Sequence, residues 1–248
     1  MSPLFSIITV TYNAASTVER TMRSVGCQTC TLYEHIVMDG ASTDDTIAIV
    51  RGLAQDGRTI VKSEPDKGLY DAMNKAQAMA RGDYLIFLNA GDAFHSADTL
   101  QHIADRILEN DYPGVVYGQT DLVDNDGRRI GPRHLAAPEV LTLDSFKSGM
   151  LVCHQAFTVL RRIAPMYNTG YRFSADYEWC IICLQHSRRN VYLPEVTIDY
   201  LAEGTTTANH KASLRERFRI MCTYFGTVPT ILRHIGFAIR SLKRKFGS

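Results

Sequence analysis

Along residues 1–95, short apolar runs alternate with segments whose apolar residues recur at helical spacing. A continuous apolar run of this kind suits a strand that is buried on both faces of a sheet. The runs predict strands at 5–10, 34–38, 59–62 and 84–88. The periodic segments predict helices from a capping Ser16 to 25, from a capping run at 42–45 to 53, and from 69 to 81. The alternation predicts an α/β fold, with a mostly parallel sheet and helices on both faces.

In the rest of the chain the alternation of strands and helices is less regular. Helices are predicted at 99–109 and 176–185, and strands at 115–118, 128–130, 156–160, 191–193 and 196–200. The run at 124–127, Asp-Asn-Asp-Gly, predicts a hairpin turn. Residues 203–209 are small and polar and predict a loop. The chain is helical again from 211, with an interruption near Gly226 and Pro229.

Polar residues follow two of the predicted strands at the point where each strand ends. Asp39 follows the second strand, and Asn89 and Asp92 follow the strand at 84–88. Ligands of open α/β sheets bind outside the carboxyl ends of the strands. Asp39 is therefore a candidate to accept hydrogen bonds from a base or ribose, and Asp92 a candidate to bridge Mn²⁺ or Mg²⁺ to a diphosphate. For both aspartates the alternative is a plain cap or turn residue.

Two further positions are candidates for chemistry. Asp176 begins a helical run, and a carboxylate there is a candidate general base that takes a proton from an acceptor hydroxyl. The alternative is a helix N-cap. His154 and Gln155 follow an apolar run at 150–153, and a histidine in that place is either functional or buried in the core.

Several classes of protein are disfavoured by what the sequence lacks. It has neither a G-x-G-x-x-G dinucleotide fingerprint nor a G-x-x-x-x-G-K-[ST] phosphate loop. The pairs Cys27/Cys30 and Cys180/Cys183 have zinc-ligand spacing, but the second pair lies in an apolar helical run, which favours buried thiols. We find no export signal and no apolar stretch long enough to span a membrane, so we expect a cytoplasmic protein with reduced thiols.

Charge is distributed unevenly over the 248 residues. From Lys211 to the end there are nine Lys/Arg and one Glu, a net charge of +8, whereas the first 210 residues carry −7. The basic residues alternate with large apolar ones, which is typical of a helix that lies on an anionic membrane surface. The alternative is a helix that packs on the domain with a solvated basic face. The acidic body and the missing motifs disfavour nucleic acid as a partner.

Several stretches together resemble the family 2 glycosyltransferases, which have the GT-A fold, and within them the transferases of bacterial exopolysaccharide assembly, including the colanic acid type. The matching stretches are SIITVTYN at 6–13, EHIVMDGASTDDT at 34–46, EPDKGLYDAMNK at 64–75, FLNAGD at 87–92, His154-Gln155, and SADYE at 174–178.

The resemblance implies an inverting transfer of a sugar from a nucleotide-diphosphate donor, with UDP favoured, to a hydroxyl of a lipid-linked or oligosaccharide acceptor. It implies a nucleotide-sugar-binding half at 1–95, an acceptor-side half at 96–204, and a loop with basic amphipathic helices at 205–248. It places the protein peripherally at the inner face of the cytoplasmic membrane.

The resemblance also implies a role for each matching residue. Nucleotide and donor contacts are expected from Thr11, Tyr12, Asn13, Asp39, Asp66, Asp71, Asn89 and Asp92, with Asp92 also on the metal. Asp176 is expected to be the base, His154 and Gln155 to lie on the acceptor side, and His210 or Lys211 to reach the diphosphate.

Two departures from the family pattern matter. The metal motif is usually a D-x-D-D-like run, and here Asn89 and Gly91 stand at two of its carboxylate positions. The usual Glu-Asp pair at the base reads Ala175-Asp176, so the base is kept. The altered metal motif supports one alternative, a non-catalytic partner protein that binds sugar nucleotide, and the retained base opposes it. A nucleotide-dependent oxidoreductase is disfavoured by the missing glycine fingerprint.

Overall fold

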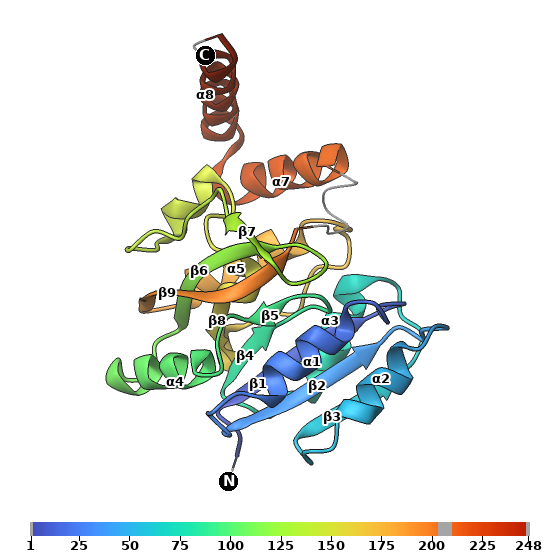
Figure 1. Ribbon diagram of the computed structural model, residues 1–248. Coiled ribbons are helices and arrows are strands. Elements are labelled where there is room, and N and C mark those ends of the chain that lie inside the picture. Colours follow the sequence, from blue (N-terminus) through green and yellow to red (C-terminus); the bar gives the residue numbers. More distant parts are fainter. Residues whose placement is uncertain (1, 203–209, 247–248) are drawn as a thin grey trace.

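The structure is a computed structural model that describes residues 2–202 and 210–246. One nine-stranded sheet runs through the described chain in the order β3-β2-β1-β4-β8-β6-β9-β5, with β7 paired to β6 (Figure 1). The sheet therefore joins strands from the beginning and the end of the sequence.

Four parallel strands form the first part of this sheet. They are β1 (Phe5–Thr11), β2 (Tyr33–Asp39), β3 (Thr59–Ser63) and β4 (Tyr84–Phe87). All residues of β1, β2 and β4 are buried, which explains why they read as continuous apolar runs. Because the strands are parallel, the residues that follow them meet at one edge of the sheet.

Helices cover both faces of these strands, as the alternation predicts. On one face α3 (Leu69–Met79) packs Tyr70 and Met73 against Ile8 and Ile36. On the other face α1 (Val18–Gly26) and α2 (Thr46–Leu53) pack around Val37.

The second part of the sheet is mixed. Strand β6 (Val115–Val123) is parallel to β9 (Asn190–Leu201) and antiparallel to β7 (Arg129–Pro132) and β8 (Phe157–Leu160), and β5 (Ala93–Phe94) is antiparallel to β9. The flanking helices are α4 (Thr99–Glu109) and α5 (Ala175–His186), and the short 3₁₀ turns are η1 (Leu143–Ser148), η2 (His154–Ala156) and η3 (Arg161–Ile163).

The strands expected at 191–193 and 196–200 are one strand, β9. Its register with β6 shifts near Gly118. A Cβ at Gly118 would lie 2.5 Å from Thr197 Cγ2 and 3.0 Å from the Glu195 carbonyl oxygen, so a larger residue at this position would collide with β9.

Two helix ends differ from the predictions. Helix α1 begins at Val18, so the predicted Ser16 cap is wrong; Thr17 precedes the helix and makes no side-chain capping bond. Helix α3 ends at Met79, before Arg81, because the buried Glu34 carboxylate accepts the backbone N–H groups of Arg81 and Gly82, at 2.6 and 3.3 Å. These bonds hold the turn between α3 and β4 in an extended conformation.

Two long helices follow the sheet. Helix α7 (His210–Phe225) places Ile220 and Met221 in the core beside α5, and α8 (Thr227–Phe246) projects away from the sheet (Figure 1). They meet at Gly226, which has a φ of 85°, so the predicted interruption is confirmed. Within residues 2–202 and 210–246, no helix is long and apolar enough to cross a membrane.

Candidate active site

Asp39 organises the edge where β1, β2 and β3 end. Its buried carboxylate accepts hydrogen bonds from Thr11 Oγ1 at 2.9 Å, Ser63 Oγ at 2.6 Å and the Ser42 backbone N–H at 2.9 Å. Burial alone would raise the pKa of Asp39, but the hydrogen bonds from Ser42, Ser63 and Thr11 lower it below its ordinary value. Asp39 is thus an ionised group that ties the three strand ends together.

Tyr12 and Asn13 extend this edge toward solvent. Asn13 lies in the left-handed region, with a φ of 48°, and its Oδ1 accepts the Thr43 backbone N–H at 2.9 Å. The bond ties the end of β1 to the loop after β2. Tyr12 is 66% exposed beside this loop. An exposed ring at a fixed position is suited to stacking on a flat base.

Asp66 lies against the turn that follows Asp39. A Cβ at Gly40 would be 2.4 Å from Asp66 Oδ2, so a larger residue would push the Asp66 side chain away, and the Tyr12 ring lies beside the same position at 3.4 Å. Asp66 Oδ1 accepts the Gly68 backbone N–H at 2.7 Å. The structure therefore brings three of the predicted site regions together: the end of β1, the end of β2 and the turn before α3.

Asp71 has a more local role. Its Oδ2 accepts the Lys67 backbone N–H at 3.0 Å and lies 3.4 Å from Lys75 Nζ. The Lys67 amide and the Lys75 ammonium lower the pKa of Asp71. The carboxylate stabilises the first turn of α3, and its contact with the donor stays a prediction.

Asp92 points into the protein. It is 4% exposed, Gln155 Nε2 donates to its Oδ2 at 2.8 Å, and the Leu201 backbone N–H donates to its Oδ1 at 3.0 Å. Burial raises the pKa of Asp92 to about 7, although these two hydrogen bonds and the charge of Arg20 act in the opposite direction. Asp92 links the end of β4 to η2 and to the end of β9.

The side chains at this strand end do not fit a metal ion held by carboxylates. Both oxygens of Asp92 are engaged, and Gly91, with a φ of 102°, has no side chain to offer. Asn89 Oδ1 is buried and has no hydrogen-bond partner among the described residues, but one amide oxygen is a poor site for a divalent ion. In the part of the chain that the structure describes, no three His, Cys, Asp or Glu side chains come together to bind a metal.

Asp176 lies at the start of α5 and faces α3. Ser174 occupies the cap position before the helix, so Asp176 is not the N-cap that the alternative interpretation required. Tyr70 Oη donates to Asp176 Oδ1 at 3.1 Å, and the Tyr177 backbone N–H approaches the same oxygen at 2.9 Å. Among the described residues, Asp176 Oδ2 accepts no hydrogen bond. This oxygen is thus available to an incoming group.

His154 and Gln155 lie in the interior. His154 is 4% exposed, its Nε2 is 2.7 Å from Tyr167 Oη, and its ring packs against those of Phe87 and Trp179. Burial lowers the pKa of His154 to about 4, so the imidazole is neutral at pH 7. The geometry favours a core histidine, and Gln155 is engaged with Asp92. Contact of either residue with an acceptor stays a prediction.

The residues expected at the diphosphate are described only in part. The loop at 203–209 lies outside the described residues, and so does the side chain of His210. Lys211 is exposed in the first turn of α7. Their role at the diphosphate stays a prediction.

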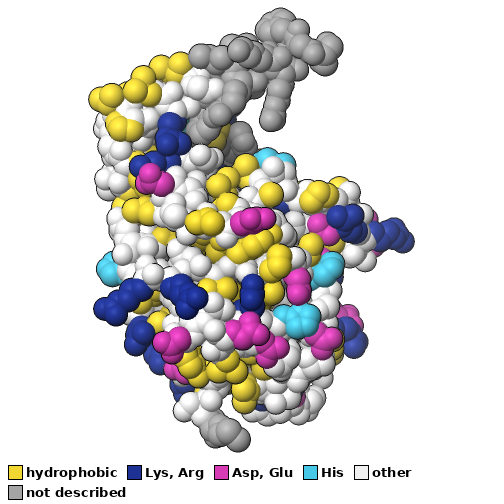
Figure 2. Space-filling view, turned by 90° about the vertical axis from the view of Figure 1, so that its left-hand side faces the viewer, with side chains coloured by type: hydrophobic (Ala, Val, Ile, Leu, Met, Phe, Trp, Pro, Cys, Tyr) yellow, Lys and Arg dark blue, Asp and Glu magenta, His cyan; other side chains and the backbone are white. Residues whose placement is uncertain are grey.

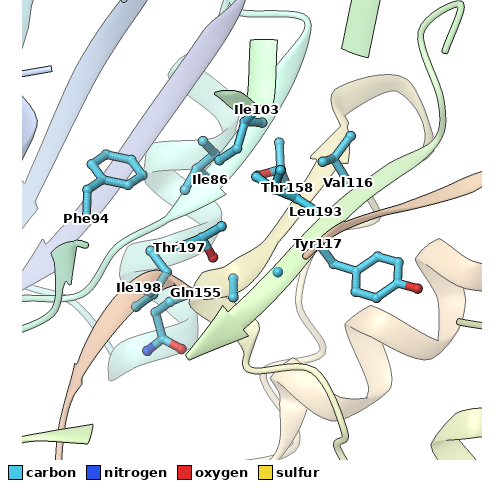
Figure 3. Close-up of a pocket in the computed structure, with 12 residues that line it drawn as sticks. Ile86, Phe94, Ile103, Val116, Tyr117, Gln155, Thr158, Leu193, Thr197 and Ile198 are labelled. Atoms are coloured by element: carbon cyan, nitrogen blue, oxygen red, sulfur yellow. The ribbon is translucent and has the colours of Figure 1, made fainter. Parts of the chain in front are cut away.

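A cavity of about 10 Å³ lies between α4 and strands β4, β6 and β9 and is not this site (Figure 3). Apolar side chains from β4, β5, α4, β6 and β9 contribute to its lining, and Gln155 borders it. It has room for about one water molecule and none for a sugar.

Sequence patterns missed the side chains that hold α3 against the rest of the site. Asn74 Nδ2 donates to the Tyr167 carbonyl oxygen at 2.9 Å, and Asn74 Oδ1 accepts the Tyr167 backbone N–H at 2.7 Å. Gln77 Nε2 donates to the Pro165 carbonyl oxygen at 3.0 Å. Tyr70, Asn74 and Gln77 are spaced by four and three residues, so they share one helix face with buried Met73. The sequence signal that could have identified these residues is the presence of polar side chains on an otherwise buried helix face.

Comparison with known proteins agrees with this architecture. The model of the family "Glycosyl transferase family 2" matches residues 6–165. A PGL/p-HBAD biosynthesis glycosyltransferase of Mycobacterium tuberculosis is 35% identical over 191 residues, which are 75% of this chain and 71% of that protein.

Two solved structures resemble the fold. S. aureus TarS 1-349 in complex with UDP-GlcNAc has a TM-score of 0.71 at 20% identity, covering 88% of this chain and 66% of that chain. The mannosyltransferase PcManGT from Pyrobaculum calidifontis, in complex with GDP-Man and Mn²⁺, has a TM-score of 0.64 at 19% identity, covering 88% and 64%. This chain thus spans just under two thirds of either solved chain.

These likenesses confirm the predicted GT-A fold. The match to the family model and the 35% identical relative confirm the resemblance found in the sequence. The chain belongs to glycosyl transferase family 2.

Proposed function

We propose that this protein is an inverting glycosyltransferase of bacterial surface polysaccharide synthesis. In this proposal it moves a hexosyl or N-acetylhexosaminyl group from a UDP-sugar to a hydroxyl of a lipid-linked or oligosaccharide acceptor. One observation carries the proposal. Asp66 lies against Gly40 at the nucleotide edge, and four residues later Tyr70 donates a hydrogen bond to Asp176. The short segment from Asp66 to Tyr70 therefore contacts both the candidate donor site and the candidate base.

The proposed reaction uses both sides of this arrangement. The acceptor oxygen attacks the anomeric carbon opposite the diphosphate, the carbon–oxygen bond to the diphosphate breaks, and Asp176 takes the proton of the acceptor hydroxyl. Oδ2 is the oxygen that receives the proton, because Oδ1 is engaged with Tyr70. The Tyr12 ring and the edge organised by Asp39 bind the nucleoside.

The solved neighbours support a sugar nucleotide as donor. TarS is named with UDP-GlcNAc and PcManGT with GDP-Man, so the fold accepts either nucleotide. Family membership and the Mn²⁺ named with PcManGT suggest a divalent cofactor, Mn²⁺ or Mg²⁺. Because the side chains around Asp92 do not fit a carboxylate-held ion, we assign no step of the reaction to a metal there.

The first half of α8 supports attachment to a membrane surface. Val228, Ile231, Leu232 and Ile235 recur at helical spacing and are 68, 44, 64 and 52% exposed. Figure 2 shows hydrophobic side chains along the upper edge of the molecule, at the height of α7 and α8 in Figure 1. Such a stripe, in a segment of net charge +8, is suited to the anionic inner face of the cytoplasmic membrane. That surface would also bring the protein to a lipid-linked acceptor.

A donor screen tests the proposal. Isothermal titration calorimetry would measure binding of UDP, UDP-N-acetylglucosamine, UDP-glucose and GDP-mannose. Radiolabelled transfer from each binding donor to a bacterial extract of lipid-linked saccharides would then be followed. We expect one nucleotide class to bind and its sugar to enter the lipid fraction. Binding without transfer to any acceptor fraction would favour the non-catalytic partner, and no binding would contradict the proposal.

A further inference from the structure

We propose that Tyr70 is a positioning residue for the general base, holding the Asp176 carboxylate so that Oδ2 faces the acceptor. The inference rests on the proposed role of Asp176 and adds a residue to which we assigned no role from the sequence. It is carried by the hydrogen bond from Tyr70 Oη to Asp176 Oδ1, which is 3.1 Å long and joins residues 106 positions apart.

Tyr70 is itself held firmly. It is 5% exposed, and its ring stacks on that of Tyr167, with centroids 5.5 Å apart and planes inclined by 23°. Tyr167 in turn stacks on Trp179 of α5 at 5.2 Å. Asn74, one turn further along α3, makes two hydrogen bonds to the backbone of Tyr167. The phenol therefore has little freedom to leave the carboxylate.

The chemistry of the phenol suits a permanent donor. Burial, and then the negative charge of Asp176, raise the pKa of Tyr70 well above its ordinary value, so the hydroxyl keeps its proton at any working pH. Burial raises the pKa of Tyr70, Tyr167, Cys180 and Tyr200, and the negative charge of Asp176 raises it further. Burial lowers the pKa of His154, and the Asp176 charge opposes this effect. Within this group, the Tyr70 hydroxyl is the side-chain donor to the base.

Occupying Oδ1 fixes the direction of the other oxygen. The carboxylate cannot rotate freely about its terminal torsion, so Oδ2 keeps one orientation. Loss of the hydroxyl should therefore misdirect Oδ2 and slow proton transfer without removing the base.

The test variant is Tyr70→Phe, which removes the hydroxyl and keeps the ring stack. With the donor and acceptor found in the screen, we expect kcat to fall about tenfold, while KM and UDP binding change less than twofold. A role confined to folding would instead lower the amount of folded protein and leave kcat per folded molecule unchanged.

Tyr84→Phe is the matched control. It removes another buried hydroxyl, whose hydrogen bond to the Pro113 carbonyl oxygen is 2.7 Å long and lies outside the site. It should leave kcat unchanged. An unchanged kcat in Tyr70→Phe would overturn the inference, even where Asp176→Asn abolishes transfer. Transfer at the wild-type rate by Asp176→Asn would overturn both the inference and the base assignment.

A crystal structure of the wild-type protein provides the second measurement, in case Tyr70→Phe does not fold. A distance from Tyr70 Oη to the nearer Asp176 oxygen of about 2.5–3.0 Å is the expected result. A distance beyond 3.5 Å would overturn the inference.

Discussion

Gln155 donates a hydrogen bond of 2.8 Å to Asp92, the acidic residue at the end of the altered metal motif. Together with the Leu201 N–H, this bond makes Asp92 a buried link between β4, η2 and β9. The aspartate that the sequence offers as a metal ligand is therefore engaged within the protein. This arrangement affects the stability of the protein and its dependence on metal, and the two effects can be measured separately.

Asp92 should make the protein less stable as pH rises. Its pKa is about 7 in the folded chain and near 3.8 in the unfolded chain, so the folded chain binds more protons between these values. The free energy of unfolding should then fall as pH rises from about 4 to about 7, by at most about 4 kcal/mol from this group. In Asp92→Asn the free energy of unfolding should no longer fall over this pH range, which urea unfolding at pH 5 and pH 8 would measure.

Asp144→Asn is the control for that experiment. Asp144 has a side chain that is 74% exposed and pairs with Lys147, so its replacement should keep the wild-type pH dependence. If Asp92→Asn also keeps it, the account of Asp92 as a buried, proton-binding group is wrong.

We expect that the effect of Mn²⁺ on UDP binding does not involve Asp92. Calorimetric titration of UDP in EDTA and in Mn²⁺ gives a ratio of dissociation constants for each variant. We expect Asp92→Asn and the wild type to show the same ratio within about twofold, because both carboxylate oxygens already accept hydrogen bonds. A Mn²⁺ effect that is present in the wild type and lost in Asp92→Asn would show that the carboxylate turns outward to bind the ion.

Gly40→Ala should weaken donor binding. The added Cβ would lie 2.4 Å from Asp66 Oδ2, and the aspartate side chain must move away. Because a side chain can rotate while the backbone stays, we expect little change in stability and about tenfold weaker UDP binding, which is about 1.4 kcal/mol. Gly52→Ala is the control, since no atom of the residues that the structure describes lies within 4 Å of its added Cβ. Equal UDP affinity in both variants would remove Asp66 from the donor site.

The exposed stripe of α8 should be needed for binding to anionic vesicles. Ile231→Ser, Leu232→Ser and Ile235→Ser together remove most of its apolar area. We expect the fraction that sediments with phosphatidylglycerol vesicles to fall several-fold, while UDP binding is unchanged. Val140→Ser is the control, because Val140 is 75% exposed and lies outside α7 and α8. Undiminished sedimentation of the triple variant would show that α8 is not the anchor.

The sequence predicted most of the fold because local signals decide it. Strands β1, β2 and β4 are buried on both faces and read as apolar runs, and α4 begins and ends where its periodicity does. Prediction from the sequence failed where a tertiary contact determines the end of an element. Helix α3 ends two residues earlier than predicted because Glu34, in another strand, binds the following turn.

The same distinction holds for the candidate site. Asp39 follows a strand, and its position at the sheet edge follows from that pattern. The orientation of Asp92 depends on Gln155 and Leu201, which are 63 and 109 residues away, and spacing along the chain carries no information on it. Tyr70 and Asp176 are likewise far apart in the sequence, and they meet only because α3 lies next to the start of α5 in the fold.

The most direct test of the central claim compares Asp176→Asn with the wild type in donor binding and in transfer. The amide keeps the shape of the carboxylate and cannot take a proton at neutral pH. We expect UDP to bind with the same dissociation constant within about twofold and transfer to fall about 10²–10⁴-fold, the usual contribution of a general base. Transfer at the wild-type rate by Asp176→Asn would contradict the account.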